Sequence, residues 1–224
     1  AFYNQDILTP IAEILNLGEL KLDMRNWDSL VKRIIAPTKE TTIAFVGKYV
    51  DLKESYKSLT ESIIHAGASL DARVNLKWID SEKIEPSNVE ELLKDADGVL
   101  VAGGFGERGV SGKIEAIKYA RENGVPYLGI CLGMQLALIE FARNVLKLED
   151  ANSVEFKPGC VNPIIYLIDS FIDAHGQTQI RTHQSPVGGT MRLGAYTCDV
   201  KPGSLLSQIY GGAKRVKERH RQIG

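Results

Sequence analysis

Apolar residues change their spacing repeatedly along the middle of the chain, and this change predicts alternating strands and helices. Short, nearly continuous apolar runs predict buried strands at 42–47, 74–79, 98–102 and 127–130. Between these runs the apolar residues recur at helical spacing, which predicts helices at 54–66, at 87–94, around Ile114, Ile117 and Ala120, and at 134–145. Ser87 and Glu90 have the spacing of a capping box, which predicts where the second helix begins.

This alternation predicts an α/β fold with a doubly wound, mostly parallel sheet and flanking helices. Each crossover between parallel strands needs a helix, and these helices cover the sheet. In such folds ligands bind outside the carboxyl ends of the strands. Functional residues are therefore expected directly after the predicted strands.

Both ends of the chain depart from the alternation. Residues 1–40 carry apolar positions at helical spacing and predict helical pieces with polar breaks. Beyond Val161 the pattern loosens, and it predicts strands at 164–168 and 179–182 and a glycine-rich stretch at 188–194. We predict that residues 41–224 form the main domain and that residues 1–40 precede it as a separate extension.

Composition narrows the classes of function. The chain has 224 residues, of which 44% are hydrophobic, so it can bury one sizeable core. With 27 basic and 28 acidic residues, the net charge of -1 argues against nucleic acid or a membrane surface as a partner. The apolar stretches are too short to span a bilayer and the first residues lack the pattern of a signal peptide, so a cytoplasmic protein is expected.

The three cysteines are odd in number and widely spaced, which argues against a disulfide framework and against a Cys/His zinc site. No metal site is therefore predicted. Cys131 differs from Cys160 and Cys198 because it ends a predicted strand, begins a predicted helix and is flanked by glycines in Gly129-Ile130-Cys131-Leu132-Gly133.

This arrangement is typical of a nucleophile elbow, in which the nucleophile occupies a strained turn between strand and helix. Side chains at the flanking positions would collide with the neighbouring strand and helix, so glycine is needed there. The start of a helix favours the thiolate through its dipole and its free N–H groups. The motif alone leaves a second interpretation open, in which Cys131 is a small buried residue without chemistry.

A second glycine turn follows another predicted strand. Gly103-Gly104-Phe105-Gly106 ends the strand at 98–102 and offers bare backbone N–H groups at the same edge of the sheet. Together with the N–H of Leu132, these donors would stabilise an oxyanion formed on an attacked amide. The two turns together favour nucleophilic catalysis over a structural cysteine.

The residues at 129–135, Gly-Ile-Cys-Leu-Gly-Met-Gln, together with the glycine turn at 103–106, resemble the class I glutamine amidotransferases. Within that family the chain resembles the CTP synthases over about 43–221. The stretches that carry this narrower resemblance are Val46-Gly47-Lys48-Tyr49-Val50 with Tyr56-Lys57-Ser58, 150–156 and 188–194. The resemblance implies that residues 1–40 are the tail of an amidoligase domain and a linker.

The resemblance also implies roles for particular residues. Cys131 would attack the side-chain amide of L-glutamine, release ammonia and form a glutamyl thioester. Gly104 and Leu132 would supply the oxyanion hole, and Gln135 and Glu155 would bind the polar ends of glutamine. The full set of glutamine-binding residues would be Gly104, Phe105, Leu132, Gly133, Met134, Gln135 and Glu155.

Partners and cofactors follow from the same resemblance. The domain itself would need no cofactor, and ammonia would pass to the amidoligase domain, where ATP, Mg²⁺ and UTP bind. The full-length protein would be a homotetramer with GTP as an activator. Arg181 matches the start of the family's lid loop and would meet a phosphate of that activator, although an ordinary surface arginine is the preferred interpretation.

The sequence departs from the family at the catalytic base. The family places His-Pro-Glu near its C-terminus, whereas His65, His175, His183 and His220 are not followed by Pro and Glu. The match ends after Arg221, so no arginine is assigned to the glutamine carboxylate and the last strand and helix of the domain are absent. These 224 residues alone are therefore expected to be inactive.

Two other interpretations stay open. The first is a docking or assembly module in which the cysteine is structural. The second is a cysteine hydrolase of the dienelactone type, which shares the elbow but lacks the stretch at 188–194.

Overall fold

The computed structural model describes residues 7–18, 23–48, 50–104, 106–166, 170–172, 177–180 and 192–222. The chain divides into two compact units, which are described separately. The first combines 1–41 with 54–75, and the second combines 42–53 with 76–224.

The first unit contains three helices. They are α1 (Leu8–Ile14), α2 (Arg25–Ile35) and α3 (Lys57–Ser69). Arg33 on α2 donates from Nη1 to the carbonyl of Ser69 over 3.2 Å and so joins α2 to the end of α3. These helices confirm the predicted helical pieces within residues 1–40, and they confirm that a helix follows the first strand of the sheet.

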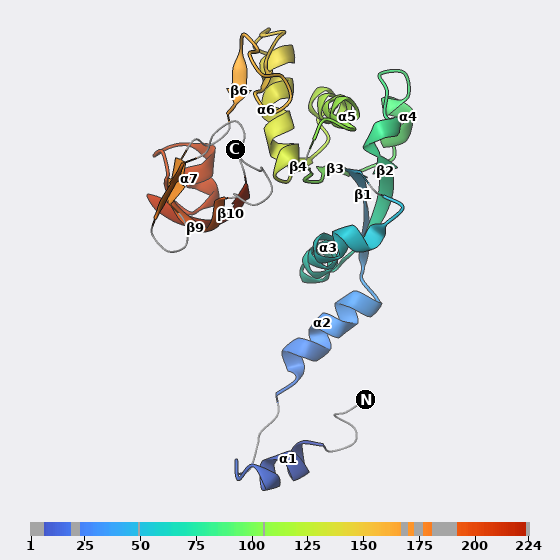
Figure 1. Cartoon of the computed structure of the whole chain (residues 1–224). Coiled ribbons are helices and arrows are strands. Elements are labelled where there is room, and N and C mark those ends of the chain that lie inside the picture. The colour runs from blue at the N-terminus through green and yellow to red at the C-terminus, as the bar shows by residue number, and fades with distance from the viewer. Residues whose placement is uncertain are drawn as a thin grey trace. The chain divides into compact units, whose positions relative to one another are not determined.

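The central sheet has four strands in the order β2-β1-β3-β4 (Figure 1). They are β1 (Lys39–Gly47), β2 (Ala72–Asp80), β3 (Gly98–Val101) and β4 (Tyr127–Gly129). β1 is parallel to β3 and β3 is parallel to β4, with Phe45 opposite Leu100 and Leu100 opposite Leu128. All four predicted strands are confirmed, and so is the mostly parallel sheet with crossovers in both directions from β1.

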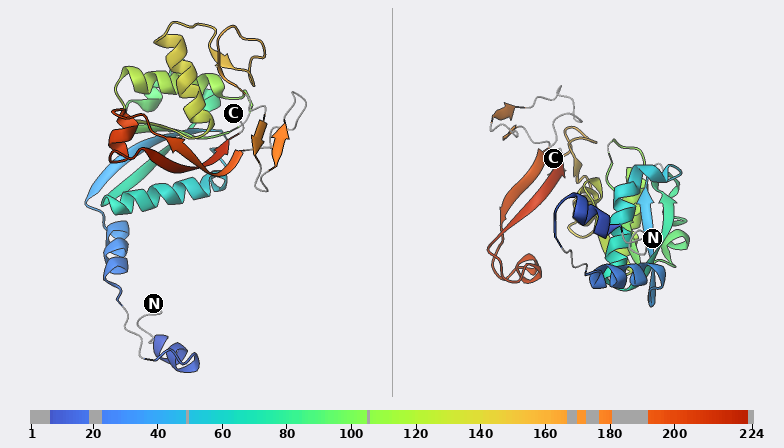
Figure 2. Two further views of the ribbon diagram at one scale, coloured as in Figure 1. Left: turned by 90° about the vertical axis from the view of Figure 1, so that its left-hand side faces the viewer. Right: turned by 90° about the horizontal axis from the view of Figure 1, so that it is seen from below.

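The core of the second unit lies between this sheet and two helices, α5 (Val110–Glu122) and α6 (Leu132–Asn144). Figure 2 shows α5 and α6 side by side above the strands. The predicted helical face is buried, since Ile114, Ile117 and Ala120 are at most 8% exposed. Removing these side chains from water is the main source of stability for this unit.

The face of α6 that points away from this core is apolar as well. Its exposed residues are Met134, Leu138, Phe141 and Val145, which are 43%, 51%, 46% and 41% exposed. They recur at helical spacing and form one stripe, which we call the α6 stripe.

Within the described ranges, every helix is too short or too polar to cross a bilayer.

The capping-box prediction at Ser87 is wrong. Helix α4 covers Val89–Leu93, and its N-cap is Asn88. Ser87 Oγ donates to the carboxylate of Glu85, while the side chain of Asn88 accepts from the backbone N–H of Glu85 over 2.9 Å. Local polar bonds on the residues before the helix therefore displace the predicted cap.

The C-terminal part of the second unit consists of short strand pairs. The parallel pair is β5 (Asn152–Ser153) with β6 (Pro163–Ile165), and the antiparallel pairs are β7 (Ser170–Ile172) with β8 (Thr178–Ile180) and β9 (Arg192–Asp199) with β10 (Arg215–Gln222). A short helix, α7 (Leu205–Ile209), lies between β9 and β10. The predicted strands at 164–168 and 179–182 overlap β6 and β8, and residues 167–169 and 181–191 lie outside the described residues.

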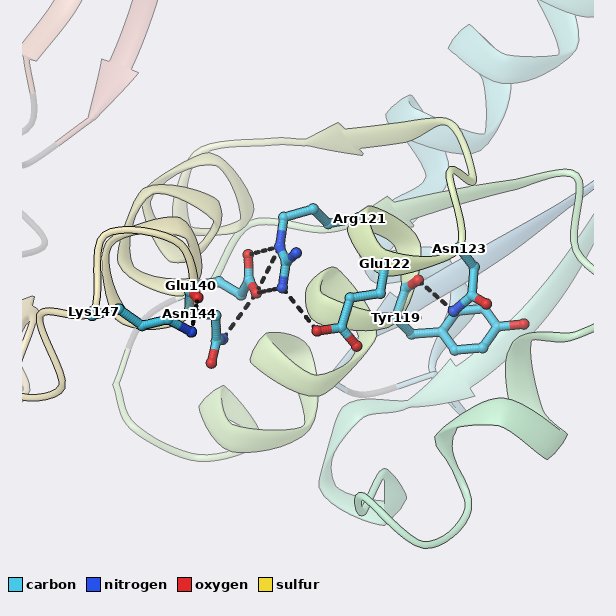
Figure 3. Close-up of polar contacts among 7 residues, drawn as sticks. All are labelled: Tyr119, Arg121, Glu122, Asn123, Glu140, Asn144 and Lys147. Atoms are coloured by element: carbon cyan, nitrogen blue, oxygen red, sulfur yellow. Dashed lines mark hydrogen bonds and ion pairs between the residues drawn. The ribbon is translucent and has the colours of Figure 1, made fainter.

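A buried ion pair joins α5 to α6 (Figure 3). The side chain of Glu140 is 1% exposed, and both Nε and Nη2 of Arg121 donate to its carboxylate at 2.8–3.0 Å. Asn144 Nδ2 donates to the same carboxylate over 2.9 Å. The carboxylate is thus satisfied on several sides, which is what a charge in a core requires.

We expect Glu140→Ala to destabilise the fold, because it removes these bonds and leaves the Arg121 guanidinium without its buried partner. The expected loss in the free energy of unfolding is about 2 kcal/mol. Urea unfolding followed by circular dichroism measures it. Glu122→Ala is the matched control, because that carboxylate is 50% exposed and contacts the same arginine. Equal losses in the two variants would contradict a structural role for the buried pair.

Candidate active site

Cys131 occupies a strained turn between β4 and α6. Its φ of 54° and ψ of -109° lie in a region that residues with a side chain rarely adopt. The side chain is partly exposed, whereas Cys160 is buried at 7% exposure. The predicted strained turn between strand and helix is therefore confirmed, and the residue that occupies it is not fully buried.

The flanking glycines are sterically required. A Cβ on Gly129 would lie 2.6 Å from backbone atoms of Gly133 and Met134, and a Cβ on Gly133 would lie 2.2 Å from the carbonyl oxygen of Val101. Real Cβ atoms do not approach backbone so closely. Tyr127 Oη also donates to the carbonyl of Gly133 over 2.7 Å, which joins β4 to the first turn of α6.

The second glycine turn packs directly against this elbow. A Cβ on Gly103 would lie 3.3 Å from Cβ of Cys131, and a Cβ on Gly104 would lie 4.0 Å from Cδ2 of Leu132. The two turns follow the neighbouring parallel strands β3 and β4, so both sit at the carboxyl edge of the sheet. The predicted adjacency of the two turns is confirmed, while Phe105 lies outside the described residues.

Gln135 lies one turn along α6 from the cysteine, and its backbone N–H donates to the carbonyl of Cys131 over 3.2 Å. Gln135 is only 8% exposed. No hydrogen bond joins its side-chain amide to another described residue.

Glu155 lies between β5 and β6 and is half-buried. Its carboxylate is close enough to Lys48 to oppose the lowering of that lysine's pKa. Lys48 is 6% exposed, and its Nζ donates to the carbonyl of Gly106 over 3.3 Å. Glu155 is thus near the group that bonds to the second glycine turn.

Two buried lysines near the nucleophile were missed from the sequence. Lys113 is 0% exposed and donates from Nζ to the carbonyl of Ala102 over 3.2 Å. Burial, and then the charge of Lys48, lower the pKa of Lys113 to about 8, whereas Cys131 acts in the opposite direction. Burial, and then Arg108, lower the pKa of Lys48. The available signal was a lysine within the apolar face of the helix that carries Ile114 and Ile117.

The described residues of the cluster include neither Arg181 nor any of the four histidines. Arg181, His175 and His183 lie outside the described residues, and nothing is assigned to them. His65 is exposed on α3, as expected for a surface residue, and the backbone of His220 belongs to β10. Among the described residues, no group of His, Cys, Asp and Glu is suited to bind a metal ion.

Residues 51–222 match the family described as glutamine amidotransferase class-I. The chain belongs to the class-I glutamine amidotransferases. The match covers most of the chain and includes both the strained cysteine turn and the glycine turn that packs against it. The predicted fold class is confirmed by the same match.

Relatives of the chain narrow the comparison within this family. A CTP synthase of Campylobacter jejuni (strain 81116) is 70% identical over 220 residues, which are 98% of this chain and 40% of the relative. A CTP synthase of Sulfurimonas denitrificans is 60% identical over 221 residues, which are 99% of this chain and 41% of the relative. The chain therefore spans about 40% of the length of these relatives.

A solved structure agrees with these relatives. The chain is similar to the glutaminase domain of Trypanosoma brucei CTP synthase with bound acivicin, with a TM-score of 0.66 and 38% identity. The similarity covers 81% of this chain and 66% of that one. These findings agree with a glutaminase domain from the C-terminal part of a longer protein.

We expect Gly133→Ala to disrupt the elbow, because its Cβ would overlap the carbonyl oxygen of Val101 at 2.2 Å. The strand or the helix must shift, at an expected cost of about 3 kcal/mol in the free energy of unfolding. Gly159→Ala is the control, since its φ is +75° but no atom lies within 4 Å of the added Cβ. Backbone strain alone costs about 1 kcal/mol there. Urea unfolding compares the two, and a cost for Gly133→Ala no larger than that of the control would contradict the steric argument.

Proposed function

We propose that this chain is the glutaminase domain of a CTP synthase, which hydrolyses L-glutamine through Cys131 and supplies ammonia for the amination of UTP. The observation that carries the proposal is the strained Cys131 turn packed against Gly103. Family membership supports glutamine as the substrate class, and the relatives support CTP synthase within the family.

The chemistry would proceed in two displacements at one carbon atom. The thiolate of Cys131 attacks the side-chain carbonyl carbon of glutamine, and the carbonyl oxygen becomes an oxyanion. When this intermediate collapses, the C–N bond breaks, and the nitrogen takes up a proton and leaves as ammonia. Water then attacks the glutamyl thioester, the C–S bond breaks, and glutamate and the free thiolate are formed.

The backbone around the elbow is suited to stabilise both oxyanions. Leu132 opens α6, so its N–H belongs to the first turn of a helix, where backbone donors lack partners within the helix. Gly104 follows the glycine that packs on Cys131. Donors held by packed backbone need little reorganisation when charge develops on the substrate, and one such donor is worth about 3 kcal/mol.

Gln135 and Glu155 are proposed to bind the substrate. Gln135 is nearly buried one turn from the nucleophile, where its side-chain amide could bond to the polar groups of glutamine. The carboxylate of Glu155 suits the ammonium group of the amino acid. Gly133, Met134 and Phe105 would complete this binding site by their position in the two motifs.

The rest of the reaction would take place in an amidoligase domain. The relatives are about two and a half times as long as the part of them that this chain matches, which leaves room for such a domain. ATP, Mg²⁺ and UTP would bind there, and the whole protein would be a homotetramer activated by GTP. Arg181 is retained as a candidate contact of that activator.

The base that completes the reaction is not provided by a His-Pro-Glu motif within the printed 224 residues. We therefore expect a polypeptide of these residues alone to react once with an electrophile but to turn over glutamine poorly. A segment of the parent protein outside these residues would supply the base. The docking-module hypothesis predicts instead that Cys131 reacts like any ordinary thiol.

Labelling with acivicin, an electrophile named in the structure of the trypanosomal relative, tests the proposal. We expect Cys131 to be labelled at least tenfold faster than Cys160 and Cys198, because the helix start and the glycine turn favour its thiolate. Site-resolved mass spectrometry measures the rates. Cys131→Ala is the control and should abolish the fast phase.

Competition distinguishes the alternatives. L-Glutamine at millimolar concentration should slow the labelling of Cys131, while D-glutamine should not. Equal rates at the three cysteines would leave the docking module as the better hypothesis. Fast labelling without protection by L-glutamine would favour a cysteine hydrolase of another substrate class.

A further inference from the structure

Lys113 is buried beside the nucleophile, and no carboxylate of the described part of the chain pairs with it. It projects from α5, is 0% exposed, and its Nζ donates to the carbonyl of Ala102, the residue before the Gly103–Gly104 turn. A Cβ on Gly104 would lie 3.6 Å from this Nζ. Among the described residues, no salt bridge involves Lys113.

This placement is expensive for the fold. The neighbours of Lys113 on the helix face are Ile114 and Ile117, which belong to the core. An ammonium group in such surroundings loses its hydration, and a single neutral carbonyl returns only part of that loss. A methionine would fill a similar volume without the cost, so stability does not explain why a lysine stands here.

An anion near Nζ would compensate for the lost hydration of the Lys113 ammonium. The thiolate of Cys131 would be such an anion. The charge of Cys131 interacts favourably with the ammonium of Lys113. Gly103 and Gly104 link the two groups, because Gly103 packs on Cβ of Cys131 and Gly104 on Nζ of Lys113. Neither glycine carries a side chain that could screen one charge from the other.

We propose that Lys113 is a positioning residue for the nucleophile: its buried ammonium favours the thiolate of Cys131, and its bond to Ala102 anchors the Gly103–Gly104 turn. The inference rests on the proposed function only in that Cys131 is the nucleophile. The ammonium transfers no proton to substrate and touches no substrate atom in this scheme. Its effect is electrostatic and adds to that of the helix start at Leu132.

The other charges around Lys113 determine over which pH range this effect operates. Lys48 repels the ammonium, and Lys48 itself is surrounded by Arg108, Glu82 and Glu155. With a pKa of about 8, Lys113 is mostly protonated at pH 7 and loses its charge as the pH rises through 8. The thiolate forms as the pH rises, so the ion pair needs an ionised Cys131 while Lys113 still carries its proton.

The test is the pH dependence of Cys131 alkylation by iodoacetamide, followed by site-resolved mass spectrometry on the full 224-residue chain. Iodoacetamide is small and neutral and needs no glutamine site. In Lys113→Met, the midpoint of the alkylation profile should rise by about one pH unit, because an opposite charge within several ångströms shifts a pKa by this order. The rate at pH 7 should therefore fall about tenfold.

Two further variants separate the charge from the hydrogen bond and from packing. Lys113→Gln keeps a donor for the carbonyl of Ala102 but lacks the charge, so its profile should shift as in Lys113→Met. Lys113→Arg keeps the charge and should stay closer to the unaltered chain. Lys118→Met removes a half-exposed lysine from the same helix and should change nothing.

The outcomes are distinct from those that test the proposed function. An unshifted midpoint in both Lys113→Met and Lys113→Gln, with unfolding curves like that of the unaltered chain, overturns the role of Lys113 while leaving the acivicin result intact. A rate at Cys160 that changes in parallel with that at Cys131 also overturns it, because the effect would then be a general loosening of the fold. If Lys113→Met does not fold, Lys113→Gln and Lys113→Arg still decide between charge and no charge.

Discussion

The close approach of backbone to backbone at the start of α6 is the constraint on which the site depends. Gly133 leaves no room for a side chain against Val101, and Gly129 leaves none against Gly133. Because the helix can come this near to the sheet, its N-cap residue Cys131 is held at a positive φ of 54° after the end of β4. The strain of the cysteine is thus balanced by the packing of α6 on the core, in particular by the buried side chains of Leu136 and Ile139.

The sheet and the main helices were predictable from the spacing of apolar residues. The elbow was predictable from the steric need for glycine on both sides of the cysteine. Buried parallel strands are continuous apolar runs, and helices that cover them have one apolar face, so both patterns are local. The need for glycine at 129 and 133 could be predicted from the sequence, because a side chain at either position would collide with nearby backbone. The resemblance to the amidotransferases was carried by these same local motifs, and the family match agrees with it.

The features that sequence reasoning missed depend on neighbours from distant segments. Glu140 is buried because Arg121 reaches it from another helix, and nothing in the spacing of α6 marks that carboxylate as satisfied. Lys113 interrupts an apolar face, which is a detectable signal, but its relation to Cys131 exists only once β3 and β4 are paired. The predicted cap of α4 was wrong for a local reason instead of a long-range one. The side chain of Asn88 accepts a hydrogen bond from the backbone N–H of Glu85, and this bond competes with the capping box.

Helix α6 carries both the nucleophile at its N-terminus and an exposed apolar face. Its first turn presents the cysteine, and the α6 stripe lies along its outer side from Met134 to Val145. The stripe and the cysteine turn therefore belong to one continuous helix with its N-cap. Any surface that packs on those four side chains would therefore contact the same helix whose N-cap is the nucleophile.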